Sequence, residues 1–134
     1  MKKDLLLLLL MFLPLLGAHA DDSGSCGDNV TYTYVEETHT LTIFGTGAMS
    51  DYQWNNNKPW RDYKDDIEKV VIESGVTVIG KYAFYDCKGL SSATIPNTVT
   101  TIYANAFGDC SALTSITIPS SVTYIAPYAF EGCI

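Results

Sequence analysis

Residues 113–134, LTSITIPSSVTYIAPYAFEGCI, decide the fold, because the two segments before them carry the same pattern. Those segments are IEKVVIESGVTVIGKYAFYDCKG (67–89) and LSSATIPNTVTTIYANAFGDCSA (90–112), and the second of them matches residues 113–134 at 11 of 22 aligned positions. Apolar residues and cysteines recur at a constant step of 23 residues, which predicts an array of equivalent structural units. The columns are Ile72, Ile95 and Ile118; Val76, Val99 and Val122; Ile79, Ile102 and Ile125; Ala83, Ala106 and Ala129; Phe84, Phe107 and Phe130; and Cys87, Cys110 and Cys133.

Each repeated segment is too short to bury its apolar side by itself, so equivalent units bury it by stacking. Alternating side chains in the last segment predict a short strand in which Ile116 and Ile118 point inward while Ser115 and Thr117 point outward. Pro119 ends this strand, the valine and isoleucine columns form a second apolar corner, and the phenylalanine column closes the coil. The segments therefore predict a leucine-rich-repeat solenoid with short parallel strands, because a 23-residue unit lies in the length range of such repeats.

The residues from Leu113 to Cys133 read L-x-x-I-x-I-P-x-x-V-x-x-I-x-x-x-A-F-x-x-C, a string that resembles the BspA-like leucine-rich repeats of bacterial and protist surface proteins. The resemblance covers residues 67–134. The sequence departs from the pattern at Glu73, where a proline is expected, and at Ala93, where a larger apolar residue is expected. The resemblance implies extracellular adhesion or binding of host proteins, and it implies no catalysis.

Residues 21–66 lack the repeat. Residues 30–35 and 40–44 read as two strands of a hairpin around residues 36–39, and the segment from Cys26 to Trp60 also resembles the start of BspA-like domains. A solenoid needs a shield over the apolar face of its first coil, so we expect a small β-rich N-terminal cap here, with a partial first coil at residues 41–43. The expected domains are a signal peptide at 1–20, the cap with its β-hairpin at 21–66, and three repeats at 67–89, 90–112 and 113–134, with the array incomplete at its C-terminal end.

The N-terminus has the parts of a secretory signal peptide: basic residues at Lys2 and Lys3, an apolar run over residues 5–16, and small residues at Ala18 and Ala20. The apolar run has 12 residues, whereas a helix that spans a bilayer needs roughly 20. This length and the cleavage pattern disfavour the alternative, a short membrane anchor. We therefore expect a secreted or cell-surface protein whose mature chain has no membrane span.

Removal of residues 1–20 leaves six basic and fourteen acidic residues, a net charge of −8, and such a chain is repelled by nucleic-acid phosphates. His39 is the one histidine that remains, and no nucleophile in a recognisable motif accompanies it. The aspartate pairs at 21–22 and 65–66 lack the spacing of a calcium loop. We therefore expect no nucleic-acid binding, no enzymatic activity, no cofactor and no metal site.

The column of three cysteines also suggests a metal site or a disulfide. Adjacent coils lie about 4.8 Å apart, so the three sulfurs form a line that cannot surround one zinc ion tetrahedrally. Aligned side chains point the same way rather than toward each other, so we expect Cys87, Cys110 and Cys133 to be buried thiols. Cys26 lies outside the column, and a disulfide between Cys26 and Cys87 is the alternative for that residue.

Outward positions of the stacked strands predict a strip of short polar side chains, which suits a broad contact with an extracellular protein or glycan. A tyrosine on the second corner is expected to add an aromatic anchor at the edge of this strip. The alternative is that serine and threonine lie there only because they are soluble and favour strands. The predicted ligand-binding residues are Lys69, Val71, Ser92, Thr94, Ser115, Thr117 and Tyr124.

The segment YQWNNNKPWRDY at residues 52–63 is dense in aromatic residues and asparagine. Exposed aromatic rings beside asparagine can stack on sugars, which favours a second function, a carbohydrate-binding module centred on Trp54. The competing interpretation is that Trp60 and Tyr63 cover the first coil, because large aromatic side chains are usually buried.

We predict that the exported protein begins at Asp21, because Ala18 and Ala20 match the small residues that signal peptidase accepts. N-terminal sequencing of the protein recovered outside the cell measures this directly. A mature protein that retains residues 5–16 contradicts the prediction.

Overall fold

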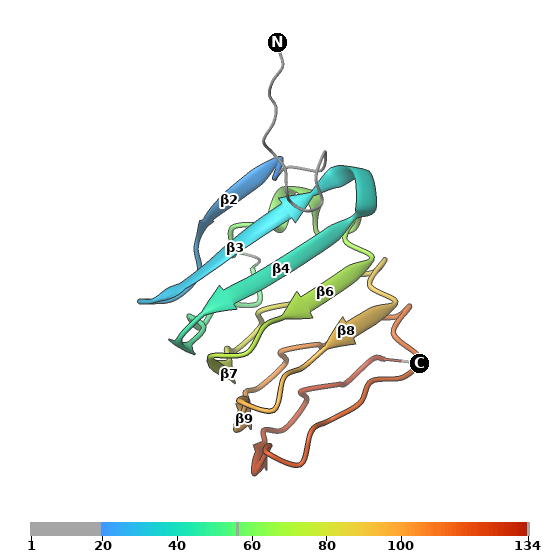
Figure 1. The fold of residues 1–134 in the computed structure, drawn as a ribbon. Helices are drawn as coiled ribbons and strands as arrows, with labels where there is room; N and C mark the ends of the chain where they lie inside the picture. The colour runs from blue at the N-terminus through green and yellow to red at the C-terminus, as the bar shows by residue number, and fades with distance from the viewer. Residues whose placement is uncertain (1–19, 56, 134) are drawn as a thin grey trace.

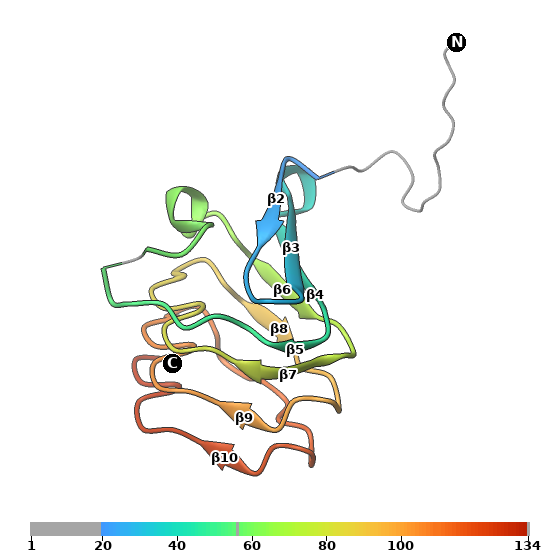
Figure 2. The same cartoon turned by 90° about the vertical axis from the view of Figure 1, so that its left-hand side faces the viewer.

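The computed structural model describes residues 20–55 and 57–133, which form two β-sheets; the predicted signal peptide lies outside the described residues except for Ala20. Figure 1 shows the first sheet, with the strand order β2-β3-β4-β6-β8, and Figure 2 shows the second, with the order β10-β9-β7-β5. Two short 3-10 helices, η1 (Glu36–Thr38) and η2 (Arg61–Tyr63), lie in the connections. The strands are β2 (Asp22–Ser25), β3 (Val30–Val35), β4 (Thr40–Gly45), β6 (Lys69–Ile72) and β8 (Ser92–Thr94) in the first sheet, and β5 (Gly47–Ala48), β7 (Val76–Ile79), β9 (Thr101–Ile102) and β10 (Tyr124–Ile125) in the second.

The first two repeats each contribute one strand to each sheet, and equivalent strands pair in parallel. Lys69 pairs with Ser92 in the first sheet and Val78 pairs with Thr101 in the second, so that partners lie one 23-residue unit apart. The predicted stacking of parallel strands is confirmed. The second apolar corner is itself a strand, because main-chain hydrogen bonds continue between the coils on this side as well.

The third repeat differs from the two before it. Its residues 113–119 form no strand, so the strand predicted around Ser115 and Thr117 is wrong, although Ile116 and Ile118 do pack against the core. Among the described residues no main-chain hydrogen bond joins residues 114–118 to β8, so no ladder forms there. This repeat also has a described neighbouring coil on one side only, which leaves it less buried. Its isoleucine column shows the effect, because Ile102 is fully buried whereas 45% of Ile125 is exposed.

The core contains a continuous stack of aromatic rings, one from each coil. Ring centroids lie 5.7 Å apart for Trp60 and Phe84, 5.2 Å for Phe84 and Phe107, and 5.3 Å for Phe107 and Phe130. Trp60 thus takes the place of the phenylalanine column in a coil before the first repeat. That coil is a full turn, because β4 pairs in parallel with β6 and β5 pairs in parallel with β7, whereas the sequence predicted only a partial coil.

The hairpin of β3 and β4, connected by η1, lies at the N-terminal end of the solenoid (Figure 1). Strand β2 pairs with the free edge of β3, and both pairings are antiparallel. Tyr32 and Tyr34 point inward from β3 and are buried, while Thr33 between them points outward. The first sheet therefore extends beyond the repeats by antiparallel strands that share its inner and outer faces.

Main-chain hydrogen bonds on the third side of the coils, where each coil connects to the next, run in one direction. On the strand sides both directions occur, since Thr123 N–H donates to Thr100 O (2.9 Å) in the coil before it, whereas Gly47 N–H donates to Gly75 O (2.9 Å) in the coil after it. On the third side the earlier coil donates, as Phe84 N–H does to Ala106 O (2.7 Å). Carbonyl groups of each repeat on this side therefore need donors from the coil before it.

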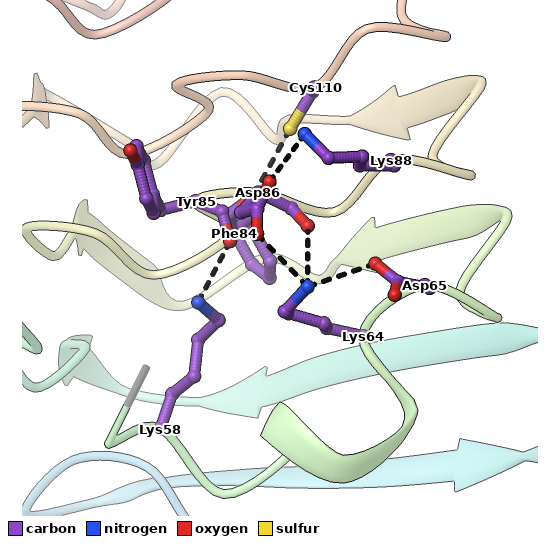
Figure 3. A network of polar contacts seen from close by, with 8 residues as sticks. All are labelled: Lys58, Lys64, Asp65, Phe84, Tyr85, Asp86, Lys88 and Cys110. Carbon is purple, nitrogen blue, oxygen red and sulfur yellow. Dashed lines mark hydrogen bonds and ion pairs between the residues drawn. The ribbon is translucent and has the colours of Figure 1, made fainter. Parts of the chain in front are cut away.

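The coil before the first repeat supplies these donors largely from side chains, and Figure 3 shows one of them, the Lys58 ammonium at Tyr85 O. The first repeat presents three carbonyl groups, at positions equivalent to those of Ala104, Ala106 and Gly108 one coil later. The three donors are Tyr52 N–H to Lys81 O (2.8 Å), the indole N–H of Trp60 to Ala83 O (2.9 Å) and the Lys58 ammonium to Tyr85 O (2.8 Å).

Lys58 is 1% exposed, an unusual environment for a lysine side chain, and burial lowers its pKa from the ordinary value. Beside it, Lys64 makes ion pairs with Asp65 (2.9 Å) and with Asp86 (3.0 Å), and Lys88 makes a further ion pair with Asp86 (Figure 3). These pairs lower the pKa of Asp86 against the opposing effect of its partial burial. Charged side chains thus help to join the first coil to the first repeat.

We predict that Trp60→Phe lowers the free energy of unfolding by about 1–3 kcal/mol, because the ring can still stack on Phe84 while the buried carbonyl of Ala83 loses its donor. The matched control is Trp54→Phe, since 70% of Trp54 is exposed and surface substitutions usually change stability by less than about 0.5 kcal/mol. Urea denaturation of both variants measures the difference. Equal stability of the two variants contradicts the role assigned to the Trp60 indole.

All four cysteines are free thiols in the structure, so no disulfide joins Cys26 to Cys87. The thiol of Cys110 donates to Phe84 O (3.1 Å, Figure 3), one coil earlier, and that of Cys133 donates to Phe107 O (3.2 Å) in the same way. Burial raises the pKa of Cys26 and of Cys87 to about 12. The expectation of complete burial is wrong for Cys133, which is half-buried because no described coil covers it.

We predict that iodoacetamide at pH 8 alkylates Cys133 in the native protein, whereas Cys26, Cys87 and Cys110 react only after addition of denaturant. The physical reason is that the reactive thiolate forms poorly in a buried environment, and the pKa rises for all three buried thiols. Mass spectrometry of the labelled peptides gives the order of reaction. Rapid native labelling of Cys87 and Cys110 would disprove their place in the core.

Candidate binding surface

The outer face of the first sheet carries side chains that alternate with the buried core residues. Cross-strand register aligns them into a row that crosses all five strands. Ser23 and Thr94 at its ends are exposed, and the three residues between them are half-buried. The row consists of Ser23, Thr33, Thr42, Val71 and Thr94.

A second row lies beside the first on this outer face. Val35 pairs with Thr40, Thr40 pairs with Lys69, and Lys69 pairs with Ser92. Lys69 is the one charged residue in the two rows. These two rows are therefore nearly neutral, although the chain as a whole is acidic.

The structure brings four of the predicted ligand-binding residues together on this face: Lys69, Val71, Ser92 and Thr94. It also adds residues that the sequence analysis did not select, namely Ser23 on β2, Thr33 on β3 and Thr42 on β4. The sequence pattern could have identified Thr33 and Thr42, because both alternate with apolar residues in the predicted hairpin. Their alignment with the repeat strands became visible only from the pairing of β4 with β6.

Ser115 and Thr117 lie beyond β8, in the segment that forms no strand, and both are exposed. Thr117 contributes to an open depression of about 330 Å³ between the second and third repeats. Thr94 lies on the other side of this depression, so the two threonines face a common space. The depression is lined by Ala93, Thr94, Ile95, Asn97, Thr117 and Pro119.

Tyr124 does not lie at the edge of the outer face, so that part of the prediction is wrong. It belongs to β10 in the second sheet, where it pairs with Thr101. The side chain is 51% exposed and meets Tyr103 edge to face, with centroids 6.5 Å apart. The two sheets face different directions, as a comparison of Figures 1 and 2 shows, so Tyr124 and the two rows cannot contact one flat partner.

The aromatic segment at residues 52–63 divides between the core and the surface. Trp60 is fully buried, and Tyr63 stacks on Tyr34 with centroids 4.3 Å apart. Trp54 is 70% exposed. The loop that carries Trp54 is anchored at both ends, because Tyr52 bonds to the main chain of Lys81 and the indole of Trp60 bonds to the first repeat.

Carboxylates and tyrosines line a pocket of about 210 Å³ at the N-terminal end of the first sheet. Tyr32 and Tyr63 both donate to Asp22 Oδ2, at 3.0 and 2.5 Å. Burial, together with the Asp22 carboxylate, raises the pKa of Tyr32 to about 12 and that of Tyr63 as well. The lining residues are Asp21, Asp22, Tyr34, Glu36, Tyr63 and Asp66.

Within the described ranges, histidine, cysteine, aspartate and glutamate form no group of three or more that could hold a metal ion. In the same residues, no helix combines the length and the apolar character needed to cross a bilayer. His39 Nδ1 lies 3.4 Å from the hydroxyl of Tyr34, and this contact gives the imidazole a structural role in the hairpin turn.

Comparison with known proteins agrees with this geometry. A family model for the BspA type leucine rich repeat region (6 copies) matches residues 62–134. A leucine-rich repeat protein of known structure from Eubacterium ventriosum ATCC 27560 is 29% identical, with a TM-score of 0.73 over 84% of this chain and 36% of its own. Another, from Bacteroides ovatus ATCC 8483, is 25% identical, with a TM-score of 0.53 over 80% of this chain and 32% of its own.

No curated protein matches the sequence significantly. The chain spans about a third of the length of the two solved proteins. The resemblance that the sequence indicated is confirmed by the family model, which covers more than half of the chain and includes all three repeats. On this evidence the chain belongs to the BspA type leucine rich repeat family.

Proposed function

We propose that this protein is a secreted or cell-surface recognition protein that binds an extracellular protein or glycan through the outer face of its first sheet. Leucine-rich-repeat proteins generally mediate protein binding or recognition. The observation that supports the proposal most is the row of small, uncharged side chains that crosses five strands in register. The proposed role is recognition without catalysis.

The chemistry of the outer face suits a broad contact. Serine and threonine hydroxyls donate and accept hydrogen bonds, and they lose less hydration energy on binding than charged groups do. The depression between Thr94 and Thr117 offers one place for a protruding group of the partner. Lys69 supplies a single positive charge that favours an acidic group nearby.

Export is part of the same proposal. The apolar run at residues 5–16 followed by Ala18 and Ala20 supports secretion, and we propose that residues 21–66 act as the N-terminal cap of the exported solenoid. The cap assignment is supported by the antiparallel strands β2 and β3, which cover the edge of β4.

A second candidate function is carbohydrate binding through exposed aromatic side chains. Trp54 supports it, because this large side chain is held at 70% exposure on a loop anchored at both ends. Loss of glycan binding in Trp54→Ala, with no effect of changes at Thr94 and Thr117, would favour this candidate over the first.

We predict that the double substitution of Thr94 and Thr117 to Lys abolishes capture on a panel of immobilised extracellular proteins and glycans. Two long, charged side chains would block the depression and add charge beside the two nearly neutral rows. The matched control is the double substitution of Thr100 and Thr123 to Lys, because these exposed threonines have the same spacing on another side of the solenoid. Melting temperatures of both variants are measured first, and equal capture by parent and first variant rejects the outer face as the binding site.

A further inference from the structure

A left-handed backbone conformation recurs one coil apart at Tyr82, Asn105 and Tyr128. Tyrosine rarely adopts this conformation. The φ angles are 57° for Tyr82, 57° for Asn105 and 65° for Tyr128, all in the left-handed region. Asparagine enters this region readily, whereas a bulky side chain there is uncommon. The neighbouring alanines at 83, 106 and 129 are buried, so the column itself faces away from the core. A tyrosine at these positions costs stability, which points to a use for its ring.

The column belongs to a larger aromatic surface, here called the tyrosine row: Tyr82, Tyr85, Asn105 and Tyr128. Tyr82 and Tyr85 meet edge to face with centroids 5.0 Å apart. Tyr85 and Asn105 meet over Gly108, where an added Cβ would lie 3.0 Å from Tyr85 Cδ1 and 3.2 Å from Asn105 Nδ2. Gly108 is buried beneath these two side chains, and its lack of a Cβ lets ring and amide pack closely over it. Tyr128, 62% exposed, continues the row in the next coil.

The row carries hydrogen-bonding capacity without charge. Its members are three tyrosines and one asparagine, and the amide of Asn105 makes no hydrogen bond within the described part of the chain. That amide, between the rings of Tyr82 and Tyr128 along the solenoid, is available to a ligand. An amide flanked by two aromatic rings suits a sugar, which presents apolar C–H groups on its faces and hydroxyls on its rim.

The repeat spacing selects the kind of sugar chain. Neighbouring strands of a sheet lie about 4.8 Å apart, so residues two coils apart, such as Tyr82 and Tyr128, are separated by roughly 10 Å. That distance is close to the length of two units in an extended β-1,4-linked glycan. Alternate sugars of such a chain present the same face, so every second sugar can stack on a tyrosine while the sugar between them meets Asn105. The mature net charge of −8 favours a neutral chain over an acidic one.

We infer that the tyrosine row binds a neutral, linear β-1,4-linked glycan that lies along the solenoid axis, with its rings on Tyr82 and Tyr128 and its hydroxyls at Asn105. The inference rests on the second candidate function, and it names the ligand class and the residues that recognise it. Tyr52 takes the equivalent main-chain place in the first coil, but its ring packs edge to face on the buried Trp60 (centroids 5.9 Å) and is not part of the row. Trp54 follows two residues along the chain and provides a further exposed ring at that end.

The experiment is isothermal titration calorimetry of the chain from Asp21 onward with cellohexaose, and with the α-linked maltohexaose as the comparison ligand. The test variant is the double substitution Tyr82→Asn and Tyr128→Asn, because asparagine already occupies this backbone conformation at position 105. The fold should therefore be retained, with a melting temperature equal to or above that of the parent. The control variant is Thr123→Asn, an exposed position in the same repeat as Tyr128.

The expected result is binding of cellohexaose and not maltohexaose by the parent and the control, with affinity at least about tenfold weaker in the double variant. Absence of cellohexaose binding by the parent overturns the inference, as does equal binding by the parent and the double variant. Binding that is lost in Trp54→Ala but retained in the double variant also overturns it, while leaving the second candidate function in place. None of these three results bears on the outer face, which the Thr94 and Thr117 substitutions test with other ligands.

Discussion

The structure depends on one constraint: no coil of this chain can satisfy its backbone or bury its apolar side chains without a neighbouring coil. Main-chain hydrogen bonds between coils and the stack of Trp60, Phe84, Phe107 and Phe130 meet both needs at once. Because each coil contacts only its neighbours, stability accumulates along the solenoid one interface at a time. The gradient from the fully buried Ile102 to the largely exposed Ile125 follows directly from this arrangement.

The hydrogen bonds on the third side, which run from each coil to the one after it, explain why the first coil differs in sequence from the repeats. A repeat can offer main-chain N–H groups to the coil that follows it, but the coil at residues 40–66 offers an indole and an ammonium group instead. This accounts for the buried lysine, because Lys58 donates to a carbonyl that would otherwise lose its partner. The row of hydrogen bonds between the coils therefore requires Lys58 to be buried.

The same constraint leaves the outside of the solenoid free to vary, because side chains that point outward take no part in the stacking. Two surfaces of different chemistry result. The two rows on the outer face of the first sheet are nearly neutral and rich in hydroxyls, and they suit a flat macromolecular partner. The tyrosine row lies on another side, where the chain accepts strained backbone at Tyr82 and Tyr128 in order to display aromatic rings. Because the coils are evenly spaced, equivalent residues recur at a constant distance on both surfaces. A ligand with the same repeat distance can match them.

The sequence by itself determined the repeat architecture, since columns such as Phe84, Phe107 and Phe130 can stay in register over three units only if equivalent residues stack. It also identified the outward residues of the first two repeats, because side chains alternate along a strand. Only the tertiary structure decided that Trp60 joins the phenylalanine stack, because its 24-residue separation from Phe84 breaks the 23-residue period. It alone placed Tyr124 on the other sheet and left residues 113–119 without a strand. Those outcomes depend on which coils are neighbours in space, and a one-dimensional pattern carries that information only where the period is strict.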